Sequence, residues 1–157
     1  MKSRWLPLGL FILLAFLAAA IGGFATSTSV DTWYPTLRKP SWSPPNAVFG
    51  PVWTVLYLLM AVAAWWAWRV GSPADARLTV RLYGAQLALN ALWSILFFGL
   101  RSPGAALIDI VVLWLVLIRL YIRFRAVDRL AGWLWLPYVI WVSFAATLNA
   151  AIWEFNR

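Results

Sequence analysis

The stretch that decides the fold runs from residue 33 to residue 53 and reads Trp-Tyr-Pro-Thr-Leu-Arg-Lys-Pro-Ser-Trp-Ser-Pro-Pro-Asn-Ala-Val-Phe-Gly-Pro-Val-Trp. It separates two long apolar runs and contains five prolines and three tryptophans. Proline fixes φ and lacks a backbone donor, so most of this stretch cannot be helical. Tryptophan side chains are too apolar to lie free in water. We therefore predict an ordered loop whose aromatic side chains pack, as a lid, onto a bundle of membrane helices.

The rest of the chain is apolar enough to lie almost entirely in a membrane. Of its 157 residues, 64% are hydrophobic and 11% are charged, whereas soluble domains carry about 25% charged residues. An apolar run of about 20 residues can cross a bilayer. Five such windows occupy approximately residues 6–25, 47–68, 82–100, 105–124 and 130–153, with the lid loop at residues 26–46. The sequence thus predicts one all-α integral membrane domain, residues 1–157, built from five transmembrane helices.

The basic residues lie between the apolar windows and indicate the orientation of the chain. The formal net charge is +8, but the positive residues form no single tract or face, so nucleic acid is excluded as a partner. Cytoplasmic loops carry an excess of lysine and arginine. We therefore predict a cytoplasmic N-terminus and an external lid loop and C-terminus. The N-terminal side holds Lys2, Arg4, Arg69, Arg77, Arg81, Arg119, Arg123, Arg125 and Arg129, and the other side holds Arg38, Lys39, Arg101 and Arg157.

The chain contains neither cysteine nor histidine. Disulfides, thiolate catalysis and zinc sites are therefore excluded, and we expect no metal and no resident cofactor. A bound haem would also lack its usual axial ligands. The sequence shows no nucleophile or acid–base constellation that would support an ordinary hydrolase or transferase.

Polar side chains gather in the half of the membrane that lies beneath the predicted lid. Gln86 and Asn90 are four residues apart and share a helix face. We expect them to hydrogen-bond across helices, with Asp109 or Asn149 as partners, or else to contact a ligand. Asp109 is the one carboxylate inside an apolar window. We expect a structural bond between it and a donor of the last window or the loop, the alternative being a role in proton-coupled transport.

Two tryptophans are placed differently from the tryptophans at helix ends. Trp5, Trp133 and Trp135, with the group at residues 65–68, are expected to anchor the helices at the membrane interface. Trp53 and Trp141 lie away from helix ends, and Tyr57 and Ala145 follow them at helical spacing. Such faces form either plain core packing or a slot for a flat apolar ligand. At the mouth of that slot, Arg38 and Lys39 are either solvated or pair with carboxylates of the ligand.

Long segments of the chain resemble the translocator protein family, also called the tryptophan-rich sensory protein or peripheral-type benzodiazepine receptor family. The resemblance is carried by residues 33–45 and 52–57 around the lid, by residues 83–93 and 97–99, and by residues 136–141 and 144–149. It implies a five-helix bundle, often a homodimer, with a ligand pocket under the first loop. Family members bind porphyrins such as protoporphyrin IX, benzodiazepine-type drugs and, in animals, cholesterol. Some bacterial members break down protoporphyrin IX in light.

The resemblance also implies which residues form the site. By motif position, and with Arg38 and Trp42 of the loop added, the ligand-binding candidates are Trp33, Tyr34, Arg38, Trp42, Trp53, Tyr57, Asn90, Trp141, Ala145 and Leu148. The tryptophans linked to the photochemistry match Trp53 and Trp141. Gln86, Asp109 and Asn149 are expected to be structural polar residues.

Two departures from the family pattern change what is expected. The sterol-recognition segment at the end of the last helix needs a central tyrosine, and residues 148–154 lack one, so strong sterol binding is not predicted. A small-residue dimer motif is altered because Arg81 stands four residues before Ala85. Gly84 and Ala88 still form such a pair, so a homodimer remains the expectation.

Three functional hypotheses follow. The first is a membrane protein that binds tetrapyrroles such as protoporphyrin IX as a sensor or scavenger, with the lipid bilayer as its surroundings. The second adds light-dependent oxidation of the bound porphyrin. The third is a small membrane transporter, and a protein that binds lipids, sterols or drug-like molecules is kept as a further alternative.

Overall fold

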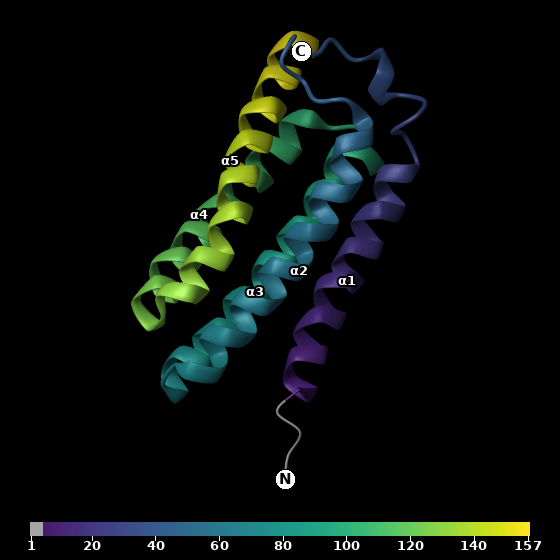
Figure 1. Cartoon of the computed structure of the whole chain (residues 1–157). Coiled ribbons are helices and arrows are strands. Elements are labelled where there is room, and N and C mark those ends of the chain that lie inside the picture. The colour runs from purple at the N-terminus through teal and green to yellow at the C-terminus, as the bar shows by residue number, and fades with distance from the viewer. Residues whose placement is uncertain (1–4) are drawn as a thin grey trace.

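The computed structural model describes residues 5–157 as a bundle of five long helices capped at one end by a loop (Figure 1). The expected charges Lys2 and Arg4 lie outside the described residues. The helices are α1 (Leu6–Ser27), α2 (Asn46–Val70), α3 (Pro73–Ser94), α4 (Pro103–Val127) and α5 (Arg129–Asn156). A short 3-10 turn, η1 (Tyr34–Thr36), lies in the loop, and a π-helical turn, η2 (Ile95–Gly99), extends α3. No strand is present among the described residues, which confirms the all-α prediction.

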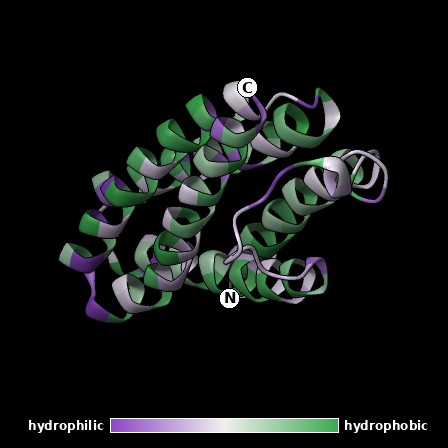
Figure 2. Ribbon diagram, turned by 90° about the horizontal axis from the view of Figure 1, so that it is seen from above, coloured by the Kyte–Doolittle hydropathy of each residue, from purple (hydrophilic) through white to green (hydrophobic). Residues whose placement is uncertain are grey.

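All five helices are long and apolar enough to cross a membrane. Their outward faces carry large exposed hydrophobic side chains, including Leu13 and Leu17 on α1 and Leu115 and Ile122 on α4. Viewed from above, the helices are green along most of their length (Figure 2). A soluble protein would not leave so much contiguous apolar surface in contact with water. The protein is thus a multi-pass integral membrane protein.

The two ends of the bundle differ in construction. The turn end holds the short α2–α3 and α4–α5 connections and the start of α1, whereas the lid end holds residues 28–45, the α3–α4 connection and the C-terminus (Figure 1). Helix α3 begins nine residues before the apolar window at 82–100, because Ser72 and Asp75 form a reciprocal capping box over its first turn. At the start of α5, the Asp128 side chain accepts hydrogen bonds from the backbone amides of Leu130 and Ala131.

Packing inside the bundle depends on small residues and a few large aromatics. Helix α5 packs along α4 and also contacts α2, whereas α1 packs on α2, α3 and η2. The α4–α5 approach is close at Gly132, where a Cβ atom would lie 3.1 Å from the Arg125 Cα atom. Trp135 is fully buried, and its indole nitrogen donates to the Leu117 carbonyl oxygen. The expectation that Trp135 anchors the membrane interface is therefore wrong, and so is that for buried Trp65, while Trp133 is exposed as expected.

The loop at the lid end is tied to the helices beneath it. The Ser29 hydroxyl donates to the Phe98 carbonyl oxygen at 2.7 Å, and the buried Tyr34 ring packs on Phe97 and Phe98. Lys39 stays within the loop, because its Nζ donates to the Tyr34 and Leu37 carbonyl oxygens and lies 4.7 Å from the Tyr34 ring centroid. These contacts hold residues 28–45, which we call the lid, in one place.

A two-point clasp joins the lid to the last turn of α5. The Arg38 backbone amide donates to Asn156 Oδ1 at 3.0 Å, and Asn156 Nδ2 donates to the Arg38 carbonyl oxygen at 2.9 Å. The Asn156 side chain thus satisfies both backbone groups of Arg38. Removal of this side chain would free the edge of the lid that lies next to α5.

We expect Asn156→Ala to loosen the lid by about 1–2 kcal/mol, the value of two exposed hydrogen bonds. Hydrogen exchange of the backbone amides in residues 36–44 should then become roughly tenfold faster, as 1.4 kcal/mol corresponds to a factor of ten. The control is Arg157→Ala, which removes a neighbouring ion pair with Glu154 that does not touch the lid. Equal exchange in both variants would show that the clasp does not restrain the lid.

Candidate ligand-binding site

A cavity of about 650 Å³ lies under the lid, between α1, α2, α3 and α5. Ligand pockets typically measure about 300–1,000 Å³ and are mostly apolar with a few polar groups. Here the polar groups include the side chains of Thr54, Tyr57 and Asn90. The lining residues are Phe16, Ala19, Ala20, Gly22, Gly23, Thr26, Ser27, Val30, Tyr34, Asn46, Phe49, Gly50, Trp53, Thr54, Tyr57, Asn90, Trp93, Ser94, Phe97, Phe98, Trp141, Ala145, Leu148, Asn149 and Ile152.

Helices α2 and α5 supply the aromatic walls. Trp53 packs on Tyr57 with ring centroids 5.6 Å apart and meets Tyr138 edge-on at 6.2 Å. Trp141 contacts Phe49 and Phe144. The Trp141 indole nitrogen is buried and has no hydrogen-bond partner in residues 5–157. A buried donor without a partner costs free energy.

Most ligand-binding candidates named from the sequence border this cavity. They are Tyr34, Trp53, Tyr57, Asn90, Trp141, Ala145 and Leu148. Burial raises the pKa of the Tyr34 hydroxyl, so this group stays neutral and can donate a hydrogen bond at neutral pH.

The other three candidates belong to the lid and lie outside the lining. Trp33 packs edge-on against Phe97 at 5.8 Å, and the half-exposed Trp42 packs against Phe144 at 5.7 Å. The Arg38 side chain is exposed, and the backbone of this residue forms the clasp with Asn156. In this arrangement all three residues hold the cover in place rather than contact the cavity.

A chain of buried hydrogen bonds runs from the cavity into the core. The Tyr57 hydroxyl donates to Asn90 Oδ1 at 2.6 Å, and Asn90 Nδ2 donates to the Tyr138 hydroxyl at 2.7 Å. That hydroxyl donates to Gln86 Oε1 at 2.8 Å, and Gln86 Nε2 reaches the Met60 sulfur at 3.6 Å. We call these five residues the polar relay. It joins α2, α3 and α5 and fixes the orientation of the cavity residues Tyr57 and Asn90.

The expected partners of the structural polar residues need correction. Gln86 and Asn90 do form interhelical hydrogen bonds, but through the hydroxyls of Tyr138 and Tyr57 rather than through Asp109 or Asn149. Asn149 forms interhelical hydrogen bonds, because its Oδ1 accepts from the Trp93 indole and its Nδ2 donates to the Pro103 carbonyl oxygen. It also borders the cavity.

Asp109 does not make the bond expected of it. Its side chain is buried, yet neither carboxyl oxygen has a hydrogen-bond partner in the described part of the chain. Helix α4 turns it toward the bundle interior, where no donor of α5 or the lid reaches it. Asp109 does not line the cavity, so this geometry offers it no direct contact with a molecule bound there.

Sequence reasoning missed two parts of the wall. One is a face of α1 formed by small residues, which leave space for the cavity but give no sign of a site in the sequence. These residues are Ala19, Ala20, Gly22 and Gly23. The other is the π turn η2, which places Phe97 and Phe98 at the roof of the cavity. Such turns are frequent at functional sites, but their sequences carry no distinct mark. The chain leaves η2 through Arg101, a residue with a positive φ of 52°.

The profile of the TspO/MBR family matches residues 11–154. The chain belongs to this family. It is 45% identical to the tryptophan-rich protein TspO of Archaeoglobus fulgidus over 92% of this chain and 94% of that protein. It is 38% identical to the translocator protein of Sus scrofa over 100% of this chain and 94% of that protein. A tryptophan-rich sensory protein of Cereibacter sphaeroides is 40% identical over 88% of this chain and 87% of that protein.

Proposed function

We propose that this TspO/MBR family protein binds a metal-free tetrapyrrole such as protoporphyrin IX in the cavity under the lid and acts as its sensor or scavenger. The observation that carries this proposal is the pair of tryptophans, Trp53 and Trp141, that border a mostly apolar cavity of about 650 Å³. A porphyrin is flat, apolar and aromatic over both faces. Indole rings at the wall of a water-poor cavity provide the stacking surface that such a molecule needs.

The polar groups of the cavity suit the edge of this ligand. A porphyrin carries propionate carboxylates at one edge, and these need donors or water. Trp141, whose indole N–H has no partner within residues 5–157, and Tyr34 both border the cavity and carry neutral donor groups. No histidine or cysteine exists in the sequence to bind iron at an axial position, which supports a metal-free porphyrin over haem.

Light-dependent loss of the bound porphyrin is a second proposal that rests on the same two residues. An excited porphyrin can take an electron from a nearby indole, which leaves an indole radical cation and a reduced porphyrin, and dissolved dioxygen would be the oxidant that completes the oxidative loss. Both Trp53 and Trp141 border the cavity. The Trp53 ring also contacts Tyr57 and Tyr138. Tyr57 on the cavity wall and Tyr138 buried behind it are the next oxidisable groups beyond Trp53.

The test is a titration of the protein in nanodiscs with protoporphyrin IX, followed in the dark by quenching of tryptophan fluorescence. We expect the double variant Trp53→Phe, Trp141→Phe to bind about fivefold more weakly, because a smaller ring keeps part of the stacking energy of about 1–3 kcal/mol per aromatic contact. The control, Trp133→Phe with Trp153→Phe, changes two exposed tryptophans of α5 outside the cavity. Unchanged affinity in the first variant would refute the cavity assignment.

The same samples test the photochemical proposal under a lamp. Loss of porphyrin absorbance should be slower in the Trp53→Phe, Trp141→Phe variant than in the unaltered protein and in the control, once all are saturated with ligand. An equal rate in all three would mean ordinary photobleaching, in which the tryptophans take no part. Binding would then stand without the light reaction.

A further inference from the structure

A second, smaller cavity lies at the turn end, far along the bundle from the lid. It measures about 280 Å³ and is lined by Trp68 of α2 and by Ala76, Arg77, Val80 and Arg81 of α3. None of these residues borders the cavity under the lid. Binding at this second cavity would therefore be independent of the proposed function.

The cavity has a fixed apolar wall and two positive side chains. The Trp68 ring packs on Phe11 of α1 with centroids 6.2 Å apart, which holds the indole in position. Arg77 and Arg81 are exposed and one helical turn apart on the same face of α3. Two guanidinium groups at this spacing can bind one phosphate group from two sides, since arginine forms bidentate hydrogen bonds with phosphate oxygens.

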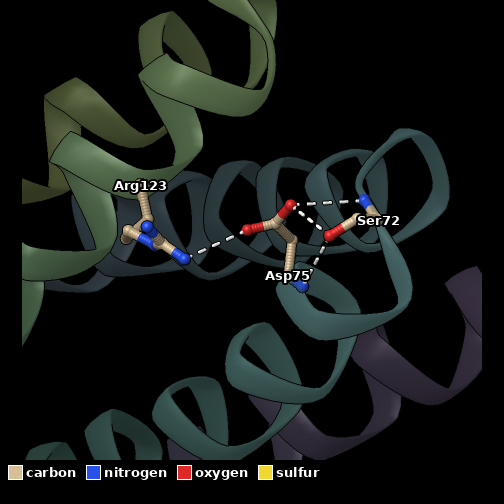
Figure 3. Close-up of polar contacts among 3 residues, drawn as sticks. All are labelled: Ser72, Asp75 and Arg123. Carbon is tan, nitrogen blue, oxygen red and sulfur yellow. Dashed lines mark hydrogen bonds and ion pairs between the residues drawn. The ribbon is translucent and has the colours of Figure 1, made fainter.

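Within residues 5–157, no carboxylate forms an ion pair with Arg77 or Arg81. The whole chain has five acidic residues, and the one nearest along α3, Asp75, is already engaged. Figure 3 shows its carboxylate between Ser72, whose hydroxyl donates at 2.6 Å, and Arg123 of α4, which forms an ion pair at 3.2 Å. Asp128, the other acid at the turn end, caps α5 and accepts a hydrogen bond from Trp66.

The surface that continues from the arginines toward the lid end is apolar and smooth. Val80 is 52% exposed, Gly84 and Ala88 are exposed above it, and a Cβ atom on Gly84 would meet nothing within 4 Å. The long apolar window begins immediately after Arg81, so we expect both guanidinium groups at the level of lipid headgroups. Long arginine side chains reach that level readily from a helix end.

We propose that Arg77 and Arg81 bind the headgroup phosphate of an anionic phospholipid, with one acyl chain lying along the Val80–Gly84–Ala88 strip. Basic pockets between transmembrane helices are known to bind anionic headgroups. A second copy of the chain, which the Gly84–Ala88 pair led us to expect in a homodimer, suits this face less well than a lipid does. If it packed here about a two-fold axis along the membrane normal, it would bring two more unneutralised arginines to the same depth.

The test uses the full chain in nanodiscs of phosphatidylcholine doped with a minor fraction of phosphatidylglycerol, with the lipids retained by the protein identified by native mass spectrometry. We expect Arg77→Gln with Arg81→Gln to weaken phosphatidylglycerol retention roughly 10- to 30-fold, since each arginine near an anionic surface contributes about a factor of five. The control is Arg125→Gln with Arg129→Gln, which removes the same charge from the same end but not from the cavity.

Three outcomes would overturn the proposal. Equal losses in the two double variants would mean general attraction to a positive surface. Release of the lipid by an equimolar amount of inorganic phosphate would mean a site for free phosphate rather than for a lipid. An altered ratio of monomer to dimer with unchanged lipid retention would mean that the face joins two copies of the chain. Because all four arginines are exposed, circular dichroism should show unchanged helicity throughout.

Discussion

Replacement of Tyr138 by phenylalanine is expected to lower the free energy of unfolding by about 2–4 kcal/mol, more than any other single hydroxyl removed from this protein. The Tyr138 hydroxyl stands at the centre of the polar relay, where it accepts from Asn90 and donates to Gln86. Its loss leaves an amide N–H and an amide oxygen without these partners at sites that are 4% and 0% exposed. Gln86 does not line the cavity and is fully buried, so no water replaces the partner that its amide oxygen loses.

The measurement is the unfolding midpoint in a graded mixture of denaturing and mild detergent, with Tyr121→Phe as the control. Tyr121 lies on α4 and is half-buried, and it takes part in none of the hydrogen bonds of the polar relay. Interhelical hydrogen bonds in membrane proteins average only about 0.6 kcal/mol. A loss no larger than that would show that the relay relaxes around the missing group and does not fix the cavity wall.

The helices were predictable because the membrane demands a simple composition. A run of about 20 apolar residues must form a helix there, since every backbone group needs an internal partner. The errors lie at the ends, where polar residues decide the boundary. Helix α3 begins at Pro73 because the Ser72–Asp75 capping box adds a polar turn that a search for apolar windows leaves out.

It was much harder to predict which side of each helix faces the interior of the bundle. Trp133 and Trp135 have the same chemistry and are two residues apart, yet one is 58% exposed and the other is fully buried. Only the rotation of α5 against α4 distinguishes them, and in a protein that is apolar on all sides no hydrophobic face reveals that rotation. The same lack of information hid Tyr138 as the partner of Gln86 and Asn90.

The residues of the cavity wall also fall into two groups, those that could be named from the sequence and those that could not. Trp53, Tyr57, Asn90 and Trp141 could be named because the family resemblance implies a ligand site at their positions, and because an amide side chain such as that of Asn90 is costly inside a membrane. The α1 wall could not, because Ala19, Ala20 and Gly22 contribute by leaving space. A cavity is defined as much by what is absent from its walls as by the groups that face it.

Ala145→Trp exploits that empty space and is expected to reduce the affinity for protoporphyrin IX on the order of 100-fold, or about 2.7 kcal/mol. Ala145 borders the cavity one turn from Trp141 and next to Leu148, so a new indole would occupy the volume in which the proposed ligand stacks. The fold should tolerate the change, because overpacking strains a protein only where the site is already filled. The readout is the dark titration in nanodiscs.

The control for this variant is Thr147→Trp, which adds a similar ring to an exposed position of the same helix outside the cavity. Thr147 donates only to the Phe144 carbonyl oxygen, so its replacement should leave both affinity and unfolding midpoint nearly unchanged. If Ala145→Trp keeps its midpoint and still binds porphyrin as tightly as the control, the ligand does not enter this cavity. If Ala145→Trp instead lowers the midpoint sharply, the cavity is closed in the membrane, and the tetrapyrrole proposal loses its supporting observation.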